Sequence, residues 1–331
     1  MNQIDDLLHT CEQGTLSRRQ LLQTLGLAGA AVFGAGALRN AAAAFAVQTG
    51  AAGNRPFPAT HVNHLAYRVA DYAKSRDFYM DLFGMRNAWD DSKGSALEFG
   101  DLKSPNGIYI RPSTDGKPSV DHIAFAMNDF MTHKMAMKAE FERRGLQNLR
   151  PDAEVGWIVD DPTGYMLNVV ITKSPAMFPG AGQICIDSAS QKCKDAYAQG
   201  MKNIEAGPKP SGRAFKAYAY STIELHVADI PKAKEFYTNV LGMKVVSEDT
   251  SEVALRFGQN TLNLRKATRP DNKSSVERFG YLVENYDHAK VKAELNRRGL
   301  NPQQASKMAW SIKDPNGFPI EVAGRVGGGT D

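Results

Sequence analysis

The feature that most constrains the fold of this 331-residue chain is an internal repeat. Three pairs of segments match: VADYAKSRDFY (69–79) with VADIPKAKEFY (227–237), ERRGL (142–146) with NRRGL (296–300), and DPTGYMLNV (161–169) with DPNGFPIEV (314–322). The offset between the copies changes only from 158 to 153 residues. Repetition at a nearly fixed offset predicts two related structural units. We therefore expect one domain at 58–174, a connector at 175–217 and a second domain at 218–325.

Each domain is itself duplicated. The segment HLAYRVAD at 64–71 is matched, 58 residues later, by HIAFAMND at 122–129, and both alternate apolar and polar residues as a strand does. A stretch of helical periodicity follows each of them, and several short alternating runs come next. The repeated unit is therefore predicted to be a strand, a helix and about three further strands. Four such βαβββ units in one chain predict an α+β protein.

This unit resembles the vicinal oxygen chelate superfamily, which includes glyoxalase I, bleomycin- and fosfomycin-resistance proteins, methylmalonyl-CoA epimerase and extradiol dioxygenases. The resemblance rests on FY-x-x-x-LGM at the end of the first helix and on DP-x-G-x-x-x-E at the end of the unit. It implies that two βαβββ units pair into a cupped mixed sheet around a site. It does not select the reaction, because one fold supports many chemistries.

The resemblance also implies where a metal ion would bind. Family ligands come from the first strand of each unit and from the last strand of the pair, usually as two histidines and a glutamate. The matching positions of the first domain are His64, His122 and Asn168, so an amide stands where the family has a carboxylate. Such a site suits Fe, Mn or Zn. The second domain has Thr222, Arg278 and Glu321 at these positions, and an arginine there predicts that it binds no metal.

Two interpretations of the first domain remain open. In one, His64 and His122 bind a divalent metal, with Asn168 as a weak oxygen ligand or with Glu98 or Glu154 completing the site. In the other, the histidines are hydrogen-bonded inside a metal-free cup.

Two further residues are candidates for substrate binding. Tyr109 and Arg111 lie on a predicted strand of the first domain and could hold an anionic or phenolic substrate. Which of them faces the cup depends on strand register. Ordinary packing and a surface cation are the alternative interpretation of this pair.

Residues 1–46 are predicted to be an export signal. Arg18 and Arg19 precede a mildly apolar stretch rich in Gly and Ala, and Ala44-Phe45-Ala46 offers a cleavage site. The SRRQLL start resembles a bacterial twin-arginine (Tat) signal. A weak membrane anchor and an ordinary secretory signal are the alternatives. The resemblance implies contact with the Tat export machinery and a periplasmic or secreted protein.

Cysteine content and charge add two expectations. Cys185 and Cys193 would remain after cleavage, and a close pair in an exported protein suggests a disulfide, with two free thiols as the alternative. The net charge is only +4, and no basic run is interleaved with aromatic residues, which argues against nucleic acid as a partner.

Three functions are consistent with the sequence. The first is a metal-dependent enzyme of dioxygenase, lyase or isomerase type, acting on a small molecule with adjacent oxygens. The second is a metal-free protein that binds or sequesters a small molecule. The third is an assembly protein whose cups are filled by side chains. A homodimer is compatible with each.

Overall fold

The computed structural model describes residues 57–101, 106–152, 156–171, 213–269 and 271–325, with single positions between 191 and 205. The predicted leader at 1–46 and the cysteine pair lie outside these residues. Within the described part of the chain, no helix is long and apolar enough to cross a membrane.

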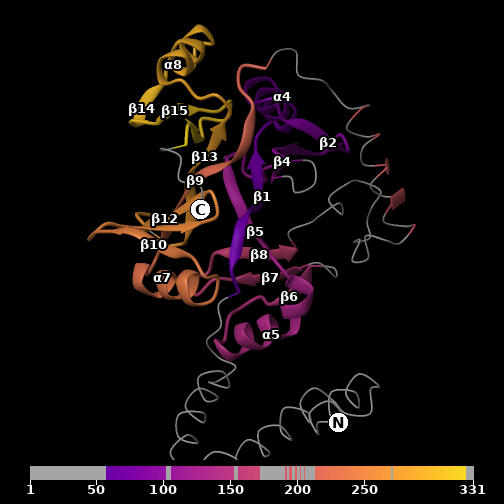
Figure 1. The fold of residues 1–331 in the computed structure, drawn as a ribbon, viewed down its shortest axis with the longest axis vertical. Helices are drawn as coiled ribbons and strands as arrows, with labels where there is room; N and C mark the ends of the chain where they lie inside the picture. The colour runs from indigo at the N-terminus through magenta and orange to yellow at the C-terminus, as the bar shows by residue number, and fades with distance from the viewer. Residues whose placement is uncertain are drawn as a thin grey trace, which may run out of the picture. The chain divides into compact units, whose positions relative to one another are not determined.

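The first domain contains two βαβββ units in one eight-stranded sheet (Figure 1). Its elements are β1 (Ala59–Val69), α4 (Tyr72–Phe83), β2 (Arg86–Asp90), β3 (Ser95–Phe99), β4 (Asn106–Pro112), β5 (Ser119–Met127), α5 (Phe130–Arg143), β6 (Arg150–Asp152), β7 (Gly156–Asp160) and β8 (Met166–Ile171). The strand order is β2-β3-β4-β1-β5-β8-β7-β6. The first strands of the two units, β1 and β5, pair antiparallel at the centre, and each pairs in parallel with the last strand of its own unit.

The second domain repeats this topology. Its elements are β9 (Ala217–Val227), α7 (Ile230–Asn239), β10 (Lys244–Glu248), β11 (Glu252–Phe257), β12 (Asn260–Lys266), β13 (Ser275–Val283), α8 (His288–Arg297), β14 (Gln303–Ser306), β15 (Ala309–Lys313) and β16 (Pro319–Ala323). The strand order β10-β11-β12-β9-β13-β16-β15-β14 matches the first sheet strand for strand. The predicted fold class, two tandem domains each built from a pair of βαβββ units in a mixed sheet, is confirmed.

The repeated VAD segments start the helices. Asp71 is the N-cap of α4 and its carboxylate accepts a hydrogen bond from the backbone N–H of Lys74 at 3.0 Å. Asp229 caps α7 in the same way through Lys232, at 2.9 Å. An N-cap carboxylate satisfies a backbone donor that the helix itself cannot. Gly84 ends α4 in the left-handed conformation, at φ 63°, which a glycine adopts without strain.

The two sheets share one buried cluster, to which both contribute aromatic side chains. The ring of Tyr281 on β13 lies 4.5 Å from that of Phe83 on α4 and 5.2 Å from that of Phe99 on β3. Tyr220 on β9 also contacts Phe99, at 5.1 Å between ring centroids. Aromatic rings bury large apolar areas, so this contact contributes strongly to stability.

Buried hydrogen bonds link the two repeats reciprocally. Tyr67 and Tyr79 of the first domain donate to the carboxylate of Asp314, in the DPNG turn of the second, at 2.6 and 3.1 Å. Tyr237 of the second domain donates to Asp161, in the DPTG turn of the first, at 2.9 Å. The repeated FY and DP-x-G motifs are therefore partners across the two domains.

We predict that Asp314→Ala lowers the free energy of unfolding by about 3 kcal/mol, because it leaves two buried tyrosine hydroxyls and the N–H groups of its own turn without an acceptor. Asp271→Ala is the control, since Asp271 is exposed and accepts from the backbone N–H of Lys273; its effect should stay below about 1 kcal/mol. Urea denaturation of both variants measures the difference. Equal losses would show that the bonds between the repeats contribute little.

Candidate functional site

Strand pairing in the first sheet aligns a row of side chains on one face of the sheet. Residues that pair directly across neighbouring strands point to the same face. The row is Glu98 on β3, Gly107 on β4, His64 on β1, Ala124 on β5 and Asn168 on β8. The next row places Tyr109, Ala66 and His122 side by side. The opposite face of β1 carries Leu65 and Tyr67, both fully buried in the shared core.

The two histidines meet at the centre of this face. Nε2 of His64 lies 3.1 Å from Nε2 of His122. The other ring nitrogen of His64, Nδ1, lies 3.0 Å from the side-chain oxygen of Asn63. Because an amide oxygen only accepts, Nδ1 carries the proton and the lone pair of Nε2 points to His122. A hydrogen bond of this kind fixes the tautomer of a metal-binding histidine.

Burial keeps both imidazoles neutral. Burial lowers the pKa of His64 well below its ordinary value, and the nearby His122 lowers it further. The pKa of His122 is also lowered by burial. The neutral imidazole is the form that binds metals. The two Nε2 atoms are 3.1 Å apart, so both imidazoles could serve one ion.

Tyr109 lies against this pair, and Arg111 lies farther along the same strand. The rings of Tyr109 and His64 are 4.4 Å apart at 31°. Burial raises the pKa of the Tyr109 phenol, as does the negative charge of Glu98. The guanidinium of Arg111 stacks over Trp89 at 4.6 Å and lies 3.7 Å from Asp91.

Asn168 is hydrogen-bonded to a neighbouring carboxylate, whose charge also acts on His122. Its Nδ2 donates to the carboxylate of Asp152 on β6 at 2.6 Å. The side chain reaches Asp152 across Gly156 of β7, where a Cβ would lie 2.9 Å from the Asn168 oxygen. That oxygen is buried without a hydrogen-bond partner. Sequence reasoning missed Asp152, which lies in a three-residue strand that no periodic pattern marks.

Glu98 is a buried carboxylate on the same face. It is 2% exposed, and neither of its oxygens has a hydrogen-bond partner. Burial raises its pKa to about 7, although the positive charge of Arg86 opposes this shift. A buried carboxyl group without a partner costs free energy in its charged form. Glu154, the other carboxylate considered from the sequence, lies outside the described residues.

The corresponding face of the second sheet contains an ion cluster. Arg278 donates to Glu224 at 2.5 Å through Nη2, and its Nε lies 3.2 Å from the carboxylate of Glu321. Glu224 also contacts Nε2 of His226 at 2.9 Å. A guanidinium therefore lies between the carboxylates of this face, while Thr222 pairs with Thr261 of β12 in the strand ladder.

The residues of the first cup fit a metal held by two histidines. Their nitrogens are close, neutral and oriented, whereas the family's third ligand position holds an amide that is bonded elsewhere. Among the residues that the structure describes, no group of three His, Cys, Asp or Glu side chains is arranged to hold a metal ion. Coordination positions beyond the histidine pair would therefore fall to Asn168, a neighbouring carboxylate, water or substrate.

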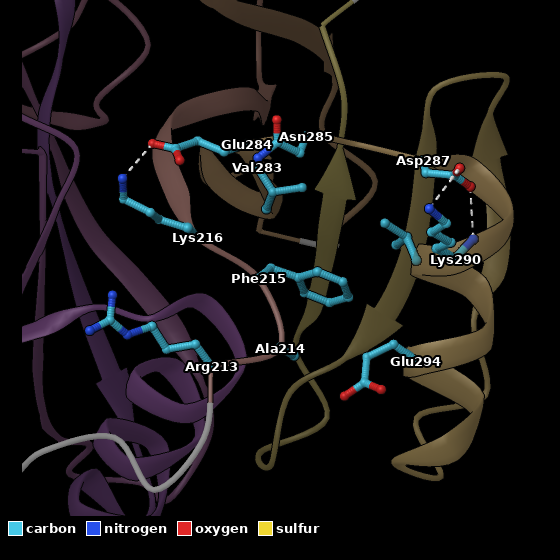
Figure 2. A pocket seen from close by; sticks show the side chains of 11 residues that line it. Arg213, Ala214, Phe215, Lys216, Val283, Glu284, Asn285, Asp287, Lys290 and Glu294 are labelled. Carbon is cyan, nitrogen blue, oxygen red and sulfur yellow. Dashed lines mark hydrogen bonds and ion pairs between the residues drawn. The ribbon is translucent and has the colours of Figure 1, made fainter.

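Two surface hollows lie away from the histidine pair. The larger, about 700 Å³, is drawn in Figure 2 and lies between the start of β9, the end of β13 and α8. Its charges are mixed and partly paired, as between Lys216 and Glu284 at 2.7 Å. The second hollow, about 440 Å³, lies beside the DPTG turn. Neither is lined by a residue of the histidine pair, so neither is assigned to the candidate site.

The amino-acid sequence of the chain matches the model of a known protein family. The model of the Glyoxalase/Bleomycin resistance protein/Dioxygenase superfamily matches residues 61–169 and 219–322. No curated protein matches the sequence.

Three solved structures illustrate the shared fold. The Mn(II)-bound glyoxalase from Novosphingobium aromaticivorans is 16% identical, with a TM-score of 0.59 over 81% of this chain and 82% of that one. The 2,3-dioxygenase LapB from Pseudomonas sp. KL28 is 15% identical, with a TM-score of 0.59 over 81% of this chain and 93% of that one. A variant of homoprotocatechuate 2,3-dioxygenase from B. fuscum is 14% identical, with a TM-score of 0.57 over 83% of this chain and 75% of that one.

We predict that Glu98→Gln stabilises the protein in a pH-dependent manner. The pKa of Glu98 is about 7 in the fold, against 4.5 for an ordinary glutamate, so the folded state binds a proton more tightly and stability falls as pH rises through this window. Since one pH unit corresponds to about 1.4 kcal/mol, the variant should match the parent near pH 4.5 and exceed it by about 3 kcal/mol at pH 8.5. Urea denaturation at both pH values measures this gain, with the exposed Glu142→Gln as control. A gain that does not change with pH would contradict the raised pKa.

Proposed function

The chain belongs to the Glyoxalase/Bleomycin resistance protein/Dioxygenase superfamily, and we propose that its N-terminal cup binds a divalent metal ion and a small molecule with two adjacent oxygen atoms. The observation that carries the proposal is the buried, neutral pair His64 and His122, whose Nε2 atoms are 3.1 Å apart. A Mn(II)-bound glyoxalase and an extradiol ring-cleaving dioxygenase share the fold. These neighbours support a metal-dependent enzyme of dioxygenase, lyase or isomerase type.

The roles of the residues follow from their contacts. His64 and His122 would hold the ion, Fe, Mn or Zn, and Asn63 would keep His64 in the ligand tautomer. A bound ion acts as a Lewis acid on substrate oxygens. Tyr109 would flank the substrate beside His64, and its raised pKa keeps the phenol protonated and able to donate a hydrogen bond. Arg111 would contact the substrate only if the substrate extends towards Trp89.

The orientation of Asn168 favours a second candidate function. A metal-free protein that binds a small molecule needs no third ligand, and the bond from Asn168 to Asp152 is compatible with a cup that has lost its metal. In that case His64 and His122 would act as hydrogen-bonding groups towards the ligand. Metal content separates the two functions.

The metal-dependent function predicts about one Mn, Fe or Zn per chain. The full chain is expressed with its leader, purified without chelators and measured by elemental mass spectrometry. His64→Ala/His122→Ala should lose the metal because it removes both nitrogen ligands. His133→Ala, an exposed histidine on α5, is the matched control and should keep it. No metal in the parent protein would favour the metal-free binding function.

We further propose that the Tat system exports the protein to the periplasm. The supporting observation is the Arg18-Arg19 pair before the apolar stretch and the Ala44-Phe45-Ala46 site. Arg18→Lys/Arg19→Lys keeps the charge but changes the pair that the export machinery reads. We expect the parent chain in the periplasmic fraction and the variant in the cytoplasm, as full-length protein. Equal export of both would indicate an ordinary secretory signal.

A further inference from the structure

We propose that Met131 and Met135 of α5 form a methionine-oxidation site, which reacts with hypohalous acids and peroxides before these oxidants reach the other methionines of the described chain. The pair thereby protects Met166 on β8, a strand of the first cup. This inference does not rest on the proposed metal or substrate, because it concerns two exposed side chains of a helix and neither histidine of the pair.

Solvent exposure separates these two methionines from the rest. An oxidant dissolved in water reacts only with a sulfur atom that it can reach. Met135 is 67% exposed and Met131 is 42% exposed. Met166 and Met308 are half-buried. Five other methionines of the described chain are at most 3% exposed: Met80, Met85, Met127, Met137 and Met243. The two thioethers of α5 are therefore the described sulfur atoms that an oxidant reaches most easily.

The two thioethers lie together on one face of α5. They are four residues apart, so they are neighbours one helical turn apart. Met137 of the same helix is fully buried in the core with Phe130 and Phe141, where α5 packs against β7 and β8 (Figure 1). One methionine of this helix therefore packs in the core, and two face the solvent.

The second repeat shows that the fold does not require the exposed pair. The ERRGL and NRRGL motifs align α5 with α8. Matched buried positions stay apolar, as Met137 and Val291 do. The exposed Met135 instead matches Ala289, and Met131 matches a polar residue. The fold therefore needs no thioether at either exposed position, and a chemical role explains the pair better than packing does.

The oxidation balances with either oxidant. With hypochlorous acid, the sulfur lone pair forms an S–Cl bond while the Cl–O bond breaks and hydroxide leaves. Water then forms the S–O bond, chloride leaves, and the water loses both protons, one of which neutralises the hydroxide. With a peroxide, the sulfur takes one oxygen as the O–O bond breaks and water or an alcohol is released. In both cases sulfur loses two electrons, the oxidant gains them, and methionine sulfoxide reductases can reverse the change.

Met166 is the methionine whose oxidation would disturb the first cup. Its Sδ accepts a hydrogen bond from Nη2 of Arg150 at 3.6 Å, and the charge of Arg150 acts on His122. A sulfoxide at Met166 would place an additional oxygen acceptor beside this guanidinium. Sulfoxides at Met131 and Met135 would face water instead. When the oxidant is limiting, reaction at the exposed pair therefore leaves less of it for Met166.

The first test measures the oxidation rate of each methionine in excess hydrogen peroxide, by mass spectrometry of peptides. Free thiols are alkylated beforehand, because thiolates react with peroxide as well. We expect Met131 and Met135 to react at least about fivefold faster than Met166 and Met308 in the folded protein. In urea the rates should become similar, since unfolding exposes every sulfur atom. A rate at Met308 that equals the rate of the pair, or a preference that persists in urea, would overturn the proposal.

The second test measures protection with a limiting amount of hypochlorous acid. Met131→Leu/Met135→Leu removes both sulfur atoms and keeps side chains of similar size, and Met308→Leu is the control that removes one half-buried thioether. Sulfoxide at Met166 should rise about threefold in the double variant and stay at the parental level in the control. A parental level in the double variant would overturn the protective role.

Thermal unfolding of the oxidised parent supplies a readout that needs no variant. Its midpoint should equal that of the untreated protein, because the added oxygens face water, and treatment with methionine sulfoxide reductases should remove them. A lower midpoint after oxidation confined to Met131 and Met135 would show that the pair contributes to the fold, which would overturn its role as an expendable site.

Discussion

The tyrosine–aspartate bonds between the repeats are the interaction on which the candidate site depends. Tyr67 lies on β1 next to Ala66, and its hydroxyl is bonded to Asp314 of the second domain. The second domain therefore holds β1 from behind while the front face of the strand presents His64. Tyr220 supports β4 similarly, since its hydroxyl donates to the carbonyl oxygen of Gly107 at 2.7 Å. A small displacement of β1 would separate His64 from His122 on β5, so the second domain supports the site although its own cup holds an ion cluster.

The two cups have the same strand arrangement but carry different polar side chains. Their strands match one for one, yet the position of His122 in the first cup is held by Arg278 in the second. An arginine stays protonated at any physiological pH and offers donors in a fixed fork. Its side chain therefore stays paired with the carboxylates of Glu224 and Glu321 and, unlike a bound metal ion, cannot dissociate from the protein. The histidine pair has the opposite property, because its imidazoles are neutral and a cation could replace the proton that lies between their Nε2 atoms.

The sequence predicts the strands that carry this site, but it does not predict the hydrogen bonds that the polar side chains of the site make. The half-repeat puts His64 and His122 at equivalent positions and the family resemblance implies that they share one site, and the structure brings their Nε2 atoms to 3.1 Å. The turn of Asn168 towards Asp152 was not predictable, since it depends on the missing side chain of Gly156 on the strand between them. The DP-x-G aspartates form turns, as this sequence is expected to, but each also accepts a hydrogen bond from a tyrosine more than 70 residues away, which no local pattern marks. The burial of Glu98 likewise emerges only from the packed sheet.

Charge balance distinguishes the two candidate functions of the first cup. A divalent ion in a poorly solvated cup needs negative charge nearby, and two neutral imidazoles supply none. The family's glutamate would supply it directly, but Asn168 does not. The cup nevertheless retains a carboxylate on each side of the histidine pair: Asp152, bonded to Asn168, and Glu98, across Gly107. A metal-free cup for a neutral ligand has no use for an unpaired buried carboxylate, whose ionisation costs free energy that the charge of Arg86 offsets only in part. Glu98 is therefore easier to explain beside a bound cation, which favours its charged form, than in a cup that has lost its metal.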